Sequence, residues 1–574
     1  MSEPIKHECA VALLRLRKTP EYYRKKYGNA DYGFSKMALL LEKQHNRGQD
    51  GAGIAALKLD PEPGFPAYRL EKSVAPENPL ADLLGRWAAK GASDGELFLG
   101  HLRYATYGRH ELGACHPFIH ESNCLRRTML VAGNFNLTNA GTLFDSFVAR
   151  GHHPASRADG YIITQTIAHY AEQDSNLHPG PPDWQKVLRQ SLGTLDGAFT
   201  LCGINGTGDA FAIRDPNAIR PGYFYFDDEV FVVTSERPAI QAAFNCSTAE
   251  VMELPPGKAV IMRRNGEIEI EDCLDPAPRR SCVFERIYFS RANDADIHRE
   301  RKKLGRSLVP ELLKAAENDF DHTFWSYIPN SAQVSFHGML EELMHRAIPS
   351  GKSVRFGQIA VKDAKFRTFI SDVDSRRELG MHVYDVTYGL IRSGEDTLVV
   401  LDDSIVRGTT MRNAILPMLD RLGPKKIVVA SSAPPIKYPD CYGIDMATAG
   451  ELIAFQAAIS LLKKQNKLHV LDEAYRLAKA DLSGESGELR NRMSMIYNAI
   501  SDDELTKEIA ALLTPHKLNA KLEVIFQSCE ALRQCCPQHT GDWYFTGDYP
   551  TPGGVKVVDR ALINFMENNH ERAY

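Results

Sequence analysis

Short apolar runs separated by turn-forming residues characterise the first half of the chain, up to about residue 275. Runs of this kind predict β-strands, and two longer stretches with apolar residues at helical spacing, Phe34–Lys43 and Gly160–Glu172, predict helices. The alternation predicts sheets packed against helices. The expected strands are Glu8–Leu16, Gly53–Leu57, Leu97–Tyr104, Thr128–Gly133, Ala198–Ile204, Ala210–Ile213, Tyr223–Phe226, Val230–Thr234 and Ala259–Arg263.

The pattern changes after Asp275–Arg280, where two prolines and a lack of periodicity indicate a linker. Beyond residue 282, short apolar strands alternate with helical stretches, which is typical of a parallel α/β sheet. Beyond about residue 448 the chain is mostly amphipathic helix. The expected strands are Thr323–Ile328, Gln358–Val361, Thr397–Leu401 and Lys426–Ala430, and the expected helices are Arg299–Lys314, Val334–Arg346, Thr410–Leu422, Gly450–Lys463 and Asp502–Leu513.

A near-neutral charge balance excludes several classes of protein. The 574 residues include 68 Lys and Arg and 73 Asp and Glu, a formal net charge of −5, whereas proteins that coat nucleic acids are strongly basic. A hydrophobic content of 43% is ordinary for a globular protein. The sequence has no apolar run long enough for a membrane span, and its charged N-terminus does not resemble a signal peptide. We therefore expect a cytoplasmic protein that binds neither nucleic acid nor membrane.

The run TLVVLDDSIVRGTT combines an apolar strand, a turn and a helix start. The strand ends in Asp402 and Asp403, at the edge where α/β sheets bind ligands, and their carboxylates can accept hydrogen bonds from sugar hydroxyls or face a hard cation. Gly408 lets the backbone approach a phosphate closely, and Thr409 and Thr410 add hydroxyl donors at the positive end of a helix. The alternative is a plain polar turn with a threonine cap, but paired aspartates before such a turn favour phosphate binding.

The same run resembles the 5-phosphoribosyl-1-diphosphate (PRPP) signature of type I phosphoribosyltransferases. The resemblance implies a parallel-sheet domain over residues 282–450 and a Mg²⁺ ion held with the help of Ser331, Asp402 and Asp403. It implies that the residues that bind PRPP are Asp402, Asp403, Ser404, Arg407, Gly408, Thr409, Thr410 and, in a loop ending at Ile370, Arg367.

Four polar, glycine-containing stretches lie in the first half of the chain: HNRGQDGAGI from His45, GHLRYATYG from Gly100, AGNFNLTN from Ala132 and RDPNAIRPGYF from Arg214. Each by itself could be a loop between strands. In this order they resemble the class II glutamine amidotransferases, whose fold is the N-terminal-nucleophile hydrolase αββα sandwich. Followed by a PRPP signature, and again in FTGDYP from Phe545, they resemble the glutamine phosphoribosylpyrophosphate amidotransferase family.

The family nucleophile is a cysteine that becomes the first residue of the chain after processing. Cys9 is the candidate, and removal of a leader, residues 1–8, is then expected. A terminal cysteine carries its own α-amine, whose ordinary pKa of about 8 suits it to act as the base for the thiol. With the leader attached, that nitrogen is an amide and cannot accept the proton. The alternative is a buried thiol in the first strand of an unprocessed chain.

The resemblance also assigns the residues that bind glutamine. Arg103 pairs with the α-carboxylate, since its fork matches a carboxylate, and Asp159 meets the α-ammonium group. Asn134 and the backbone N–H of Phe135 donate to the tetrahedral oxyanion. Arg47 belongs to the loop over the site. In the alternative reading, Arg103 and Asp159 form surface ion pairs and Asn134 is a turn residue.

Several positions depart from the family pattern. Cys9 is followed by alanine where the family has glycine, and Phe135 replaces another glycine. The diphosphate loop reads Pro329–Ala332 (PNSA), which lacks the usual aspartate and glycine, and the residues before Arg367 are altered to Asp363–Phe366. Some members hold a 4Fe–4S cluster with four cysteines, but only Cys282 matches a ligand position here, so no cluster is expected. The eleven cysteines are otherwise scattered and include no C-x-x-C pair, which excludes a zinc ribbon.

The resemblance implies an enzyme with two sites. Cys9 forms a thioester with glutamine, ammonia leaves, and the ammonia displaces diphosphate from PRPP to give 5-phosphoribosylamine at the start of purine synthesis. The expected domains are the amidotransferase domain at 9–275, the phosphoribosyltransferase domain at 282–450 and a mostly helical C-terminal extension at 451–574. A homo-oligomer inhibited by purine nucleotides is expected. The alternative, supported by the altered Pro329–Ala332 loop, is a regulatory protein that senses PRPP or nucleotides without turnover.

Overall fold

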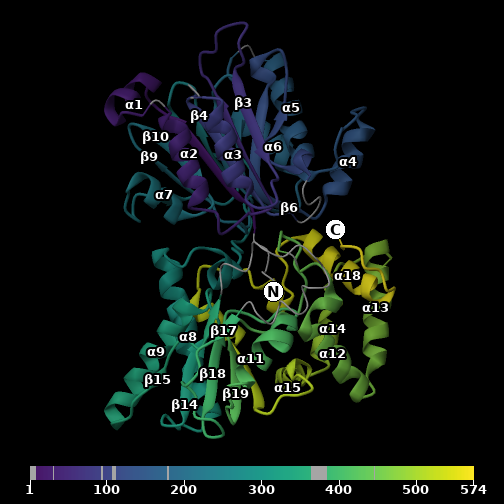
Figure 1. Cartoon of the computed structure of the whole chain (residues 1–574). Coiled ribbons are helices and arrows are strands. Elements are labelled where there is room, and N and C mark those ends of the chain that lie inside the picture. The colour runs from purple at the N-terminus through teal and green to yellow at the C-terminus, as the bar shows by residue number, and fades with distance from the viewer. Residues whose placement is uncertain are drawn as a thin grey trace. The chain divides into compact units, whose positions relative to one another are not determined.

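The computed structural model describes residues 8–29, 31–91, 95–105, 111–177, 180–362, 384–444, 446–485 and 487–573 (Figure 1). Over this part the chain forms two compact units. The N-terminal unit comprises residues 8–282 together with 441–444, and the C-terminal unit comprises residues 283–440 together with 446–573. Each of the eleven cysteines lies among the described residues, where they form no disulfide with one another.

Two antiparallel sheets form the N-terminal unit (Figure 1). The strands are β1 (Ala10–Leu16), β2 (Gly51–Leu57), β3 (Tyr68–Ser73), β4 (Leu97–Arg103), β5 (Phe118–His120), β6 (Met129–Leu137), β7 (Gly197–Asn205), β8 (Ala210–Arg214), β9 (Tyr223–Phe226), β10 (Val230–Thr234), β11 (Met252–Glu253), β12 (Lys258–Met262) and β13 (Ile268–Asp272). One sheet has the order β11-β9-β10-β1-β4-β2-β3 and the other β13-β12-β8-β7-β6-β5.

Helices cover the outer face of each sheet. Next to the seven-stranded sheet lie α1 (Pro20–Tyr27), α2 (Tyr32–Glu42), α3 (Pro79–Ala89) and α7 (Arg237–Phe244), and next to the six-stranded sheet lie α4 (Ala140–Ala149), α5 (Asp159–Leu177) and α6 (Trp184–Leu192). Short turns of helix occur at η1 (Leu112–Ala114) and η2 (Leu125–Arg127).

Strand β1 shows how the sequence produces this αββα sandwich. Alternate residues of a strand point to opposite faces, so Val11 and Leu13 enter the core between the two sheets while Ala12 and Leu14 enter the core beneath the helices. Every residue of β1 is buried because both faces are covered. The fold expected for the first half of the chain is confirmed.

A parallel five-stranded sheet with the order β15-β14-β18-β19-β20 forms the centre of the C-terminal unit. Its strands are β14 (Thr323–Tyr327), β15 (Arg355–Phe356), β18 (Thr397–Asp402), β19 (Lys426–Ser431) and β20 (Lys521–Phe526), and a separate antiparallel pair consists of β16 (Ala360–Lys362) and β17 (Tyr384–Val386). The expected strand Gln358–Val361 therefore pairs with β17 and does not join the parallel sheet.

Helices surround this sheet and form the rest of the unit. They are η3 (Glu285–Phe289), α8 (Ala295–Ala315), α9 (Gln333–Ala347), η4 (Ile348–Ser350), η7 (Met411–Ile415), α11 (Leu416–Asp420), η8 (Ala449–Glu451), α12 (Ile453–Lys464), α13 (Leu468–Ser483), α14 (Ser494–Asn498), α15 (Asp502–Leu513), α16 (Cys529–Cys535), α17 (Trp543–Thr546) and α18 (Pro552–Met566). Within the described residues, every helix is too short or too polar to cross a lipid bilayer.

Local sequence explains several helix boundaries. Ser501 and Glu504 form a reciprocal capping box that starts α15 at Asp502, the expected position. The expected helix Thr410–Leu422 is divided into η7 and α11, and Pro417 has no N–H to donate to the turn before it. Strand β20 is absent from the sequence expectation because it lies at the sheet edge and is half exposed, so it lacks the continuous apolar run of its neighbours.

Candidate functional site

Cys9 lies directly before β1, at the end of the seven-stranded sheet. Because β1 and β4 run antiparallel with Ala10 opposite Leu102, the register places Cys9 beside Arg103 and Tyr104. The backbone N–H of Tyr104 points at Cys9 Sγ, with a nitrogen–sulfur distance of 3.3 Å. Residues 100–108 carry the GHLRYATYG stretch, of which 106–108 lie outside the described residues. The strand register thus brings the expected nucleophile next to the expected carboxylate-binding arginine.

The Cys9 thiol, the Arg103 guanidinium and the Asp159 carboxylate influence one another electrostatically. Burial raises the pKa of the Cys9 thiol to about 11, against the opposing effects of the Tyr104 N–H and of Arg103. Asp159 begins α5, and burial raises the pKa of its carboxyl group to about 6 although Arg103 and the Gly160 N–H lower it. In the chain with its leader attached, the thiol is therefore protonated at neutral pH.

Asn134 and Phe135 lie on β6 in the facing sheet. The β6–β7 register pairs Phe135 with Phe199. The N–H of Phe199 donates to the Asp215 carboxylate, and its C=O accepts from the Asp215 N–H, both on the far side of β7. In an antiparallel ladder, both groups of one residue point to the same side, so the N–H of Phe135 points away from β7. Strand β5 pairs with β6 only as far as Val131 and does not reach Phe135. This direction suits a donor to a bound group.

Two stacked histidines hold the residue before Asn134. His101 of β4 and His116 lie with ring centroids 3.9 Å apart. His101 Nε2 bonds to the carbonyl of Gly133 at 3.0 Å, and the N–H of Gly133 donates to His116 Nδ1 at 3.3 Å. Burial lowers the pKa of His101 to about 3 and that of His116 well below its ordinary value, so both rings are neutral. The pair connects the two sheets at the candidate site.

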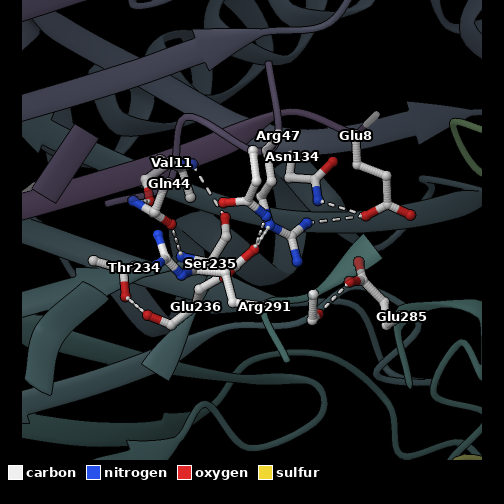
Figure 2. Close-up of polar contacts among 12 residues, drawn as sticks. Glu8, Val11, Gln44, Arg47, Asn134, Thr234, Ser235, Glu236, Glu285 and Arg291 are labelled. Carbon is white, nitrogen blue, oxygen red and sulfur yellow. Dashed lines mark hydrogen bonds and ion pairs between the residues drawn. The ribbon is translucent and has the colours of Figure 1, made fainter. Parts of the chain in front are cut away.

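The carboxylate of Glu8, the last residue of the expected leader, is buried in the same unit. Asn134 Nδ2 and Arg47 Nη1 each donate to Glu8 Oε2 at 3.2 Å (Figure 2). Arg220 forms an ion pair with the other oxygen of Glu8. Arg47 also pairs through Nε with Glu236 at 2.8 Å. The expected oxyanion donor Asn134 therefore bonds to the residue directly before Cys9.

Hydrogen bonds fix the start of β1 against β10 (Figure 2). The N–H of Val11 donates to Ser235 Oγ at 3.1 Å, and the N–H of Ser235 donates to Gln44 Oε1 at 3.0 Å. Thr234 Oγ1 donates to the carbonyl of Glu236 at 2.8 Å. These bonds fix the position of the backbone immediately after Cys9, on which the geometry of a terminal nucleophile depends.

The second candidate site lies at the carboxyl ends of β14 and β18. These strands are parallel neighbours, so the loops that follow them meet at one sheet edge. The Ser331 hydroxyl donates to Asp403 Oδ2, and the Ser404 hydroxyl donates to Asp403 Oδ1 at 2.8 Å. Asp402 accepts a bond from the N–H of Asp403 at 2.9 Å. The fold thus brings Ser331, in the loop after β14, to the run Asp402–Ser404 at the end of β18.

The two aspartates are held in an environment that disfavours their charge. Burial and the neighbouring Asp403 carboxylate raise the pKa of Asp402 well above its ordinary value. Burial also raises the pKa of Asp403, against the hydroxyl bonds and the positive charge of Arg301 on α8. Within the described residues, no three His, Cys, Asp or Glu side chains form a cluster that could hold a metal ion. Two carboxylates with hydroxyls nearby remain a fitting partial set for Mg²⁺, which takes its other ligands from water and substrate phosphates.

The loop after Asp403 has the expected glycine geometry. Gly408 has φ of +73°, and a Cβ atom there would lie 2.5 Å from Ile453 Cδ1 and 2.6 Å from Leu513 Cδ2. Arg407 Nη2 pairs with Glu451 at 2.6 Å. Thr409 is exposed and Thr410 is partly buried directly before η7. Arg367 and the altered residues before it lie outside the described residues.

Sequence reasoning missed the residues that complete the first site. The sequence predicts Glu8 as the end of a leader and the start of the strand Glu8–Leu16, with no role at a site, and it assigns no role to Arg220 inside the stretch RDPNAIRPGYF. His101 occupies GHLRYATYG without an assigned role. One sequence signal could have indicated Arg220: it is the second arginine of a polar stretch that resembles the amidotransferases. Only the fold, however, places it against Glu8.

The known proteins that this chain resembles come from one enzyme family. No family model matches the chain. The amidophosphoribosyltransferase of Archaeoglobus fulgidus is 30% identical over 366 residues, which cover 63% of this chain and 73% of that protein. The chain belongs to the amidophosphoribosyltransferase family. The members from Bacillus subtilis and Mus musculus are 29% and 28% identical over 430 and 447 residues, covering 74% and 72% of this chain and 82% and 78% of theirs.

Solved structures support the fold of this family member over almost its whole length. Glutamine PRPP amidotransferase from B. subtilis, in complex with ADP and GMP, superposes with a TM-score of 0.66 at 23% identity, covering 95% of this chain and 97% of that one. A structure described as the allosteric regulatory enzyme of purine biosynthesis gives a TM-score of 0.67 at 23% identity, covering 95% and 96%. The expected two-part fold, with its helical C-terminal region, is confirmed.

Proposed function

We propose that this chain is an amidophosphoribosyltransferase. It hydrolyses glutamine and transfers the ammonia to PRPP, which yields 5-phosphoribosylamine, glutamate and diphosphate at the start of purine synthesis. The observation that carries the proposal is the meeting of Cys9, Arg103 and Asp159 at one end of the sandwich in a member of this family. A thiol, a guanidinium and a carboxylate are the groups that a glutamine hydrolase needs.

The N-terminal unit supplies the glutamine chemistry. After the leader, residues 1–8, is removed, the α-amine of Cys9 accepts the thiol proton and the thiolate attacks the side-chain amide of glutamine. Asn134 Nδ2 and the N–H of Phe135 donate to the oxyanion, and collapse expels ammonia and leaves a thioester. Water then cleaves the carbon–sulfur bond and releases glutamate. Arg103 and Asp159 hold the amino acid, and Arg47 anchors the loop over it.

The C-terminal unit supplies the PRPP chemistry. Asp402 and Asp403 accept hydrogen bonds from the ribose hydroxyls, and the turn from Ser404 to Thr410 holds the 5′-phosphate at the start of a helix. Arg407 and Arg367 add positive charge for the phosphates. Ser331 and the two aspartates would help to hold Mg²⁺, which would supply positive charge for the leaving diphosphate. The raised pKa of Asp402 supports this assignment, because a cation there offsets the repulsion between the carboxylates.

Further features follow from the family proposal. The amidotransferase part spans 9–275, the phosphoribosyltransferase part spans 282–450, and the remainder, 451–574, is the helical extension. The B. subtilis protein was solved in complex with ADP and GMP, and we propose that purine nucleotides bind and inhibit this chain. We also expect a cytoplasmic homo-oligomer.

One assay tests the proposal. Purified protein given glutamine, PRPP and Mg²⁺ should release glutamate and diphosphate together, and Cys9→Ala should lose at least about a thousandfold of glutamine use while keeping ammonia-dependent synthesis. Mass analysis should find a chain that begins at Cys9. A chain that keeps Met1, binds PRPP and shows no turnover with either nitrogen source would establish the sensor alternative, which the Pro329–Ala332 loop favours.

A further inference from the structure

Glu8 is buried although it belongs to a leader. It is 1% exposed, and the side chains of Arg47 and Arg220 that contact it are fully buried. Three side chains converge on this one carboxylate: Arg47 and Asn134 donate hydrogen bonds to one oxygen, and Arg220 forms an ion pair with the other (Figure 2 shows Arg47 and Asn134). Because a carboxylate leaves water only where donors replace its hydration, these three side chains form a site built for a carboxylate.

Removal of the leader changes the charge balance of this site. With Glu8 in place, Arg47 and Arg220 face two carboxylates, Glu8 and Glu236. Arg47 keeps Glu236 after processing, whereas Glu8 is the carboxylate that pairs with Arg220 among the residues that the structure describes. Gly443 lies against the same guanidinium, where a Cβ atom would approach Arg220 Nη2 to 2.7 Å. A buried charge without a counter-charge is strongly unfavourable, so the mature chain requires another anion here.

The position of the site indicates which anion this is. Asn134 is the proposed donor to the oxygen of the glutamine side chain, and it now bonds to the side-chain carboxylate of Glu8. Hydrolysis converts the neutral amide of glutamine into the γ-carboxylate of glutamate. Glu8 therefore presents, next to Cys9, the same functional group that the reaction product presents.

We infer that Arg47, Arg220 and Asn134 form a carboxylate site that binds the γ-carboxylate of product glutamate, and that Glu8 fills this site in the unprocessed chain as a tethered product analogue. The inference rests on the proposed function, since it requires leader removal and glutamine hydrolysis. It assigns Arg220 to the recognition of product over substrate. Its consequences are product inhibition of the mature enzyme and a blocked glutamine site in the precursor.

Inhibition constants of the processed full-length enzyme test the role of Arg220. L-glutamate should compete with glutamine, and L-norvaline, which has a methyl group in place of the γ-carboxylate, should bind much more weakly. Arg220→Gln should raise the Ki of L-glutamate about tenfold or more, with a KM for glutamine that rises less than about threefold. Arg220→Lys is the matched control, since it keeps the charge and should recover most of the glutamate affinity. Equal changes in Ki and KM, or equal loss in both variants, would overturn the inference.

A second measurement does not depend on an Arg220 variant folding. L-glutamate should raise the melting temperature of the mature enzyme and leave that of the leader-retaining Cys9→Ala chain unchanged, because Glu8 occupies the site. An equal rise in both would overturn the tethered-analogue assignment. A wild-type chain that begins at Met1 and does not hydrolyse glutamine contradicts the proposed function itself. A processed, active enzyme whose Arg220 variants keep the wild-type ratio of Ki to KM contradicts only this inference.

Discussion

The two candidate sites differ in how their charges are balanced. In the N-terminal unit, the buried arginines Arg47 and Arg220 find carboxylate partners within the chain. In the C-terminal unit, Asp402 and Asp403 lie side by side, and the contacts to Asp403 come from hydroxyl groups. Their pKa values are raised by burial and, for Asp402, by its neighbour.

The difference reflects what each site has to bind. A neutral amide group is recognised by donors fixed in place before the substrate arrives, and in the first unit Glu236 holds Arg47, whereas the carboxylate that pairs with Arg220 belongs to the expected leader. A diphosphate brings its cation with it, so the second unit keeps two carboxylates close together at a cost in folding stability. The first unit thus has its buried charges paired while Glu8 is in place, whereas the second unit keeps two carboxylates side by side, with hydroxyl bonds and the charge of Arg301 as partial compensation.

The largest expected effect comes from replacing Asp402, which should reduce the reaction of the C-terminal unit and leave that of the N-terminal unit unchanged. Asp402→Asn should lower 5-phosphoribosylamine synthesis by about a hundredfold, because a ligand for the ribose and cation is lost, while glutamine hydrolysis continues. The melting temperature should rise. The folded-state pKa of Asp402 lies above its unfolded value, so its ionised form destabilises the fold as pH rises, and a neutral amide removes that penalty. Diphosphate release, glutamate release and a thermal melt measure the three quantities. A lower melting temperature would contradict the proposed repulsion.

Asp159 should make glutamine use sensitive to acid. Its carboxylate must be ionised to hold an ammonium group, and its pKa is raised to about 6 by burial. Asp159 should therefore contribute about a tenfold fall in kcat/KM for glutamine between pH 7 and pH 5, in addition to the fall caused by protonation of the Cys9 α-amine. Asp159→Asn should lower kcat/KM and make this profile about tenfold shallower. Asp50→Asn is the control, since Asp50 also acts on the Cys9 thiol but bonds to the N–H of Ala105, and it should keep the profile.

The stacked histidines should make the first unit less stable in acid. His101 and His116 are neutral in the fold, with pKa values lowered by burial, whereas the unfolded chain binds protons below about pH 6.5. Their stabilisation is present above that pH and is lost as the pH falls, by about 1–2 kcal/mol for each ring at pH 5. Urea unfolding at pH 7.5 and 5 measures this loss. His116→Gln should reduce it, and the exposed His153→Gln should leave it unchanged.

Gly408, in the turn after Asp403, provides the smallest expected effect, because an added methyl group there meets the ends of two apolar side chains. Gly408→Ala and Gly484→Ala each place a side chain at positive φ, +73° and +83°. A Cβ atom at Gly484 meets nothing within 4 Å, whereas at Gly408 it meets Ile453 and Leu513. Gly408→Ala should therefore cost about 1 kcal/mol more in unfolding free energy. Denaturant melts of both variants measure the difference, and equal losses would show that backbone strain alone is responsible.

Elements with strong local signals were predictable from the sequence. Strands β9 and β10 and helix α15 begin and end where the apolar pattern places them. The run from Asp402 to Thr410 could be recognised because a strand end, a glycine turn and a helix start are contiguous. Strand β20 could not, because its pairing with β19 spans about ninety residues and leaves its side chains half exposed.

The sequence by itself was sufficient to identify the family, its αββα sandwich and the candidate nucleophile Cys9, because each was recognised from motifs of contiguous residues. Only the tertiary structure placed Glu8 between Arg47, Arg220 and Asn134, and Ser331 on Asp403. These contacts join residues that are 39 to 212 positions apart. The physical reason is that a buried charge is defined by what surrounds it in space, and strand register brings those groups together from distant parts of the sequence.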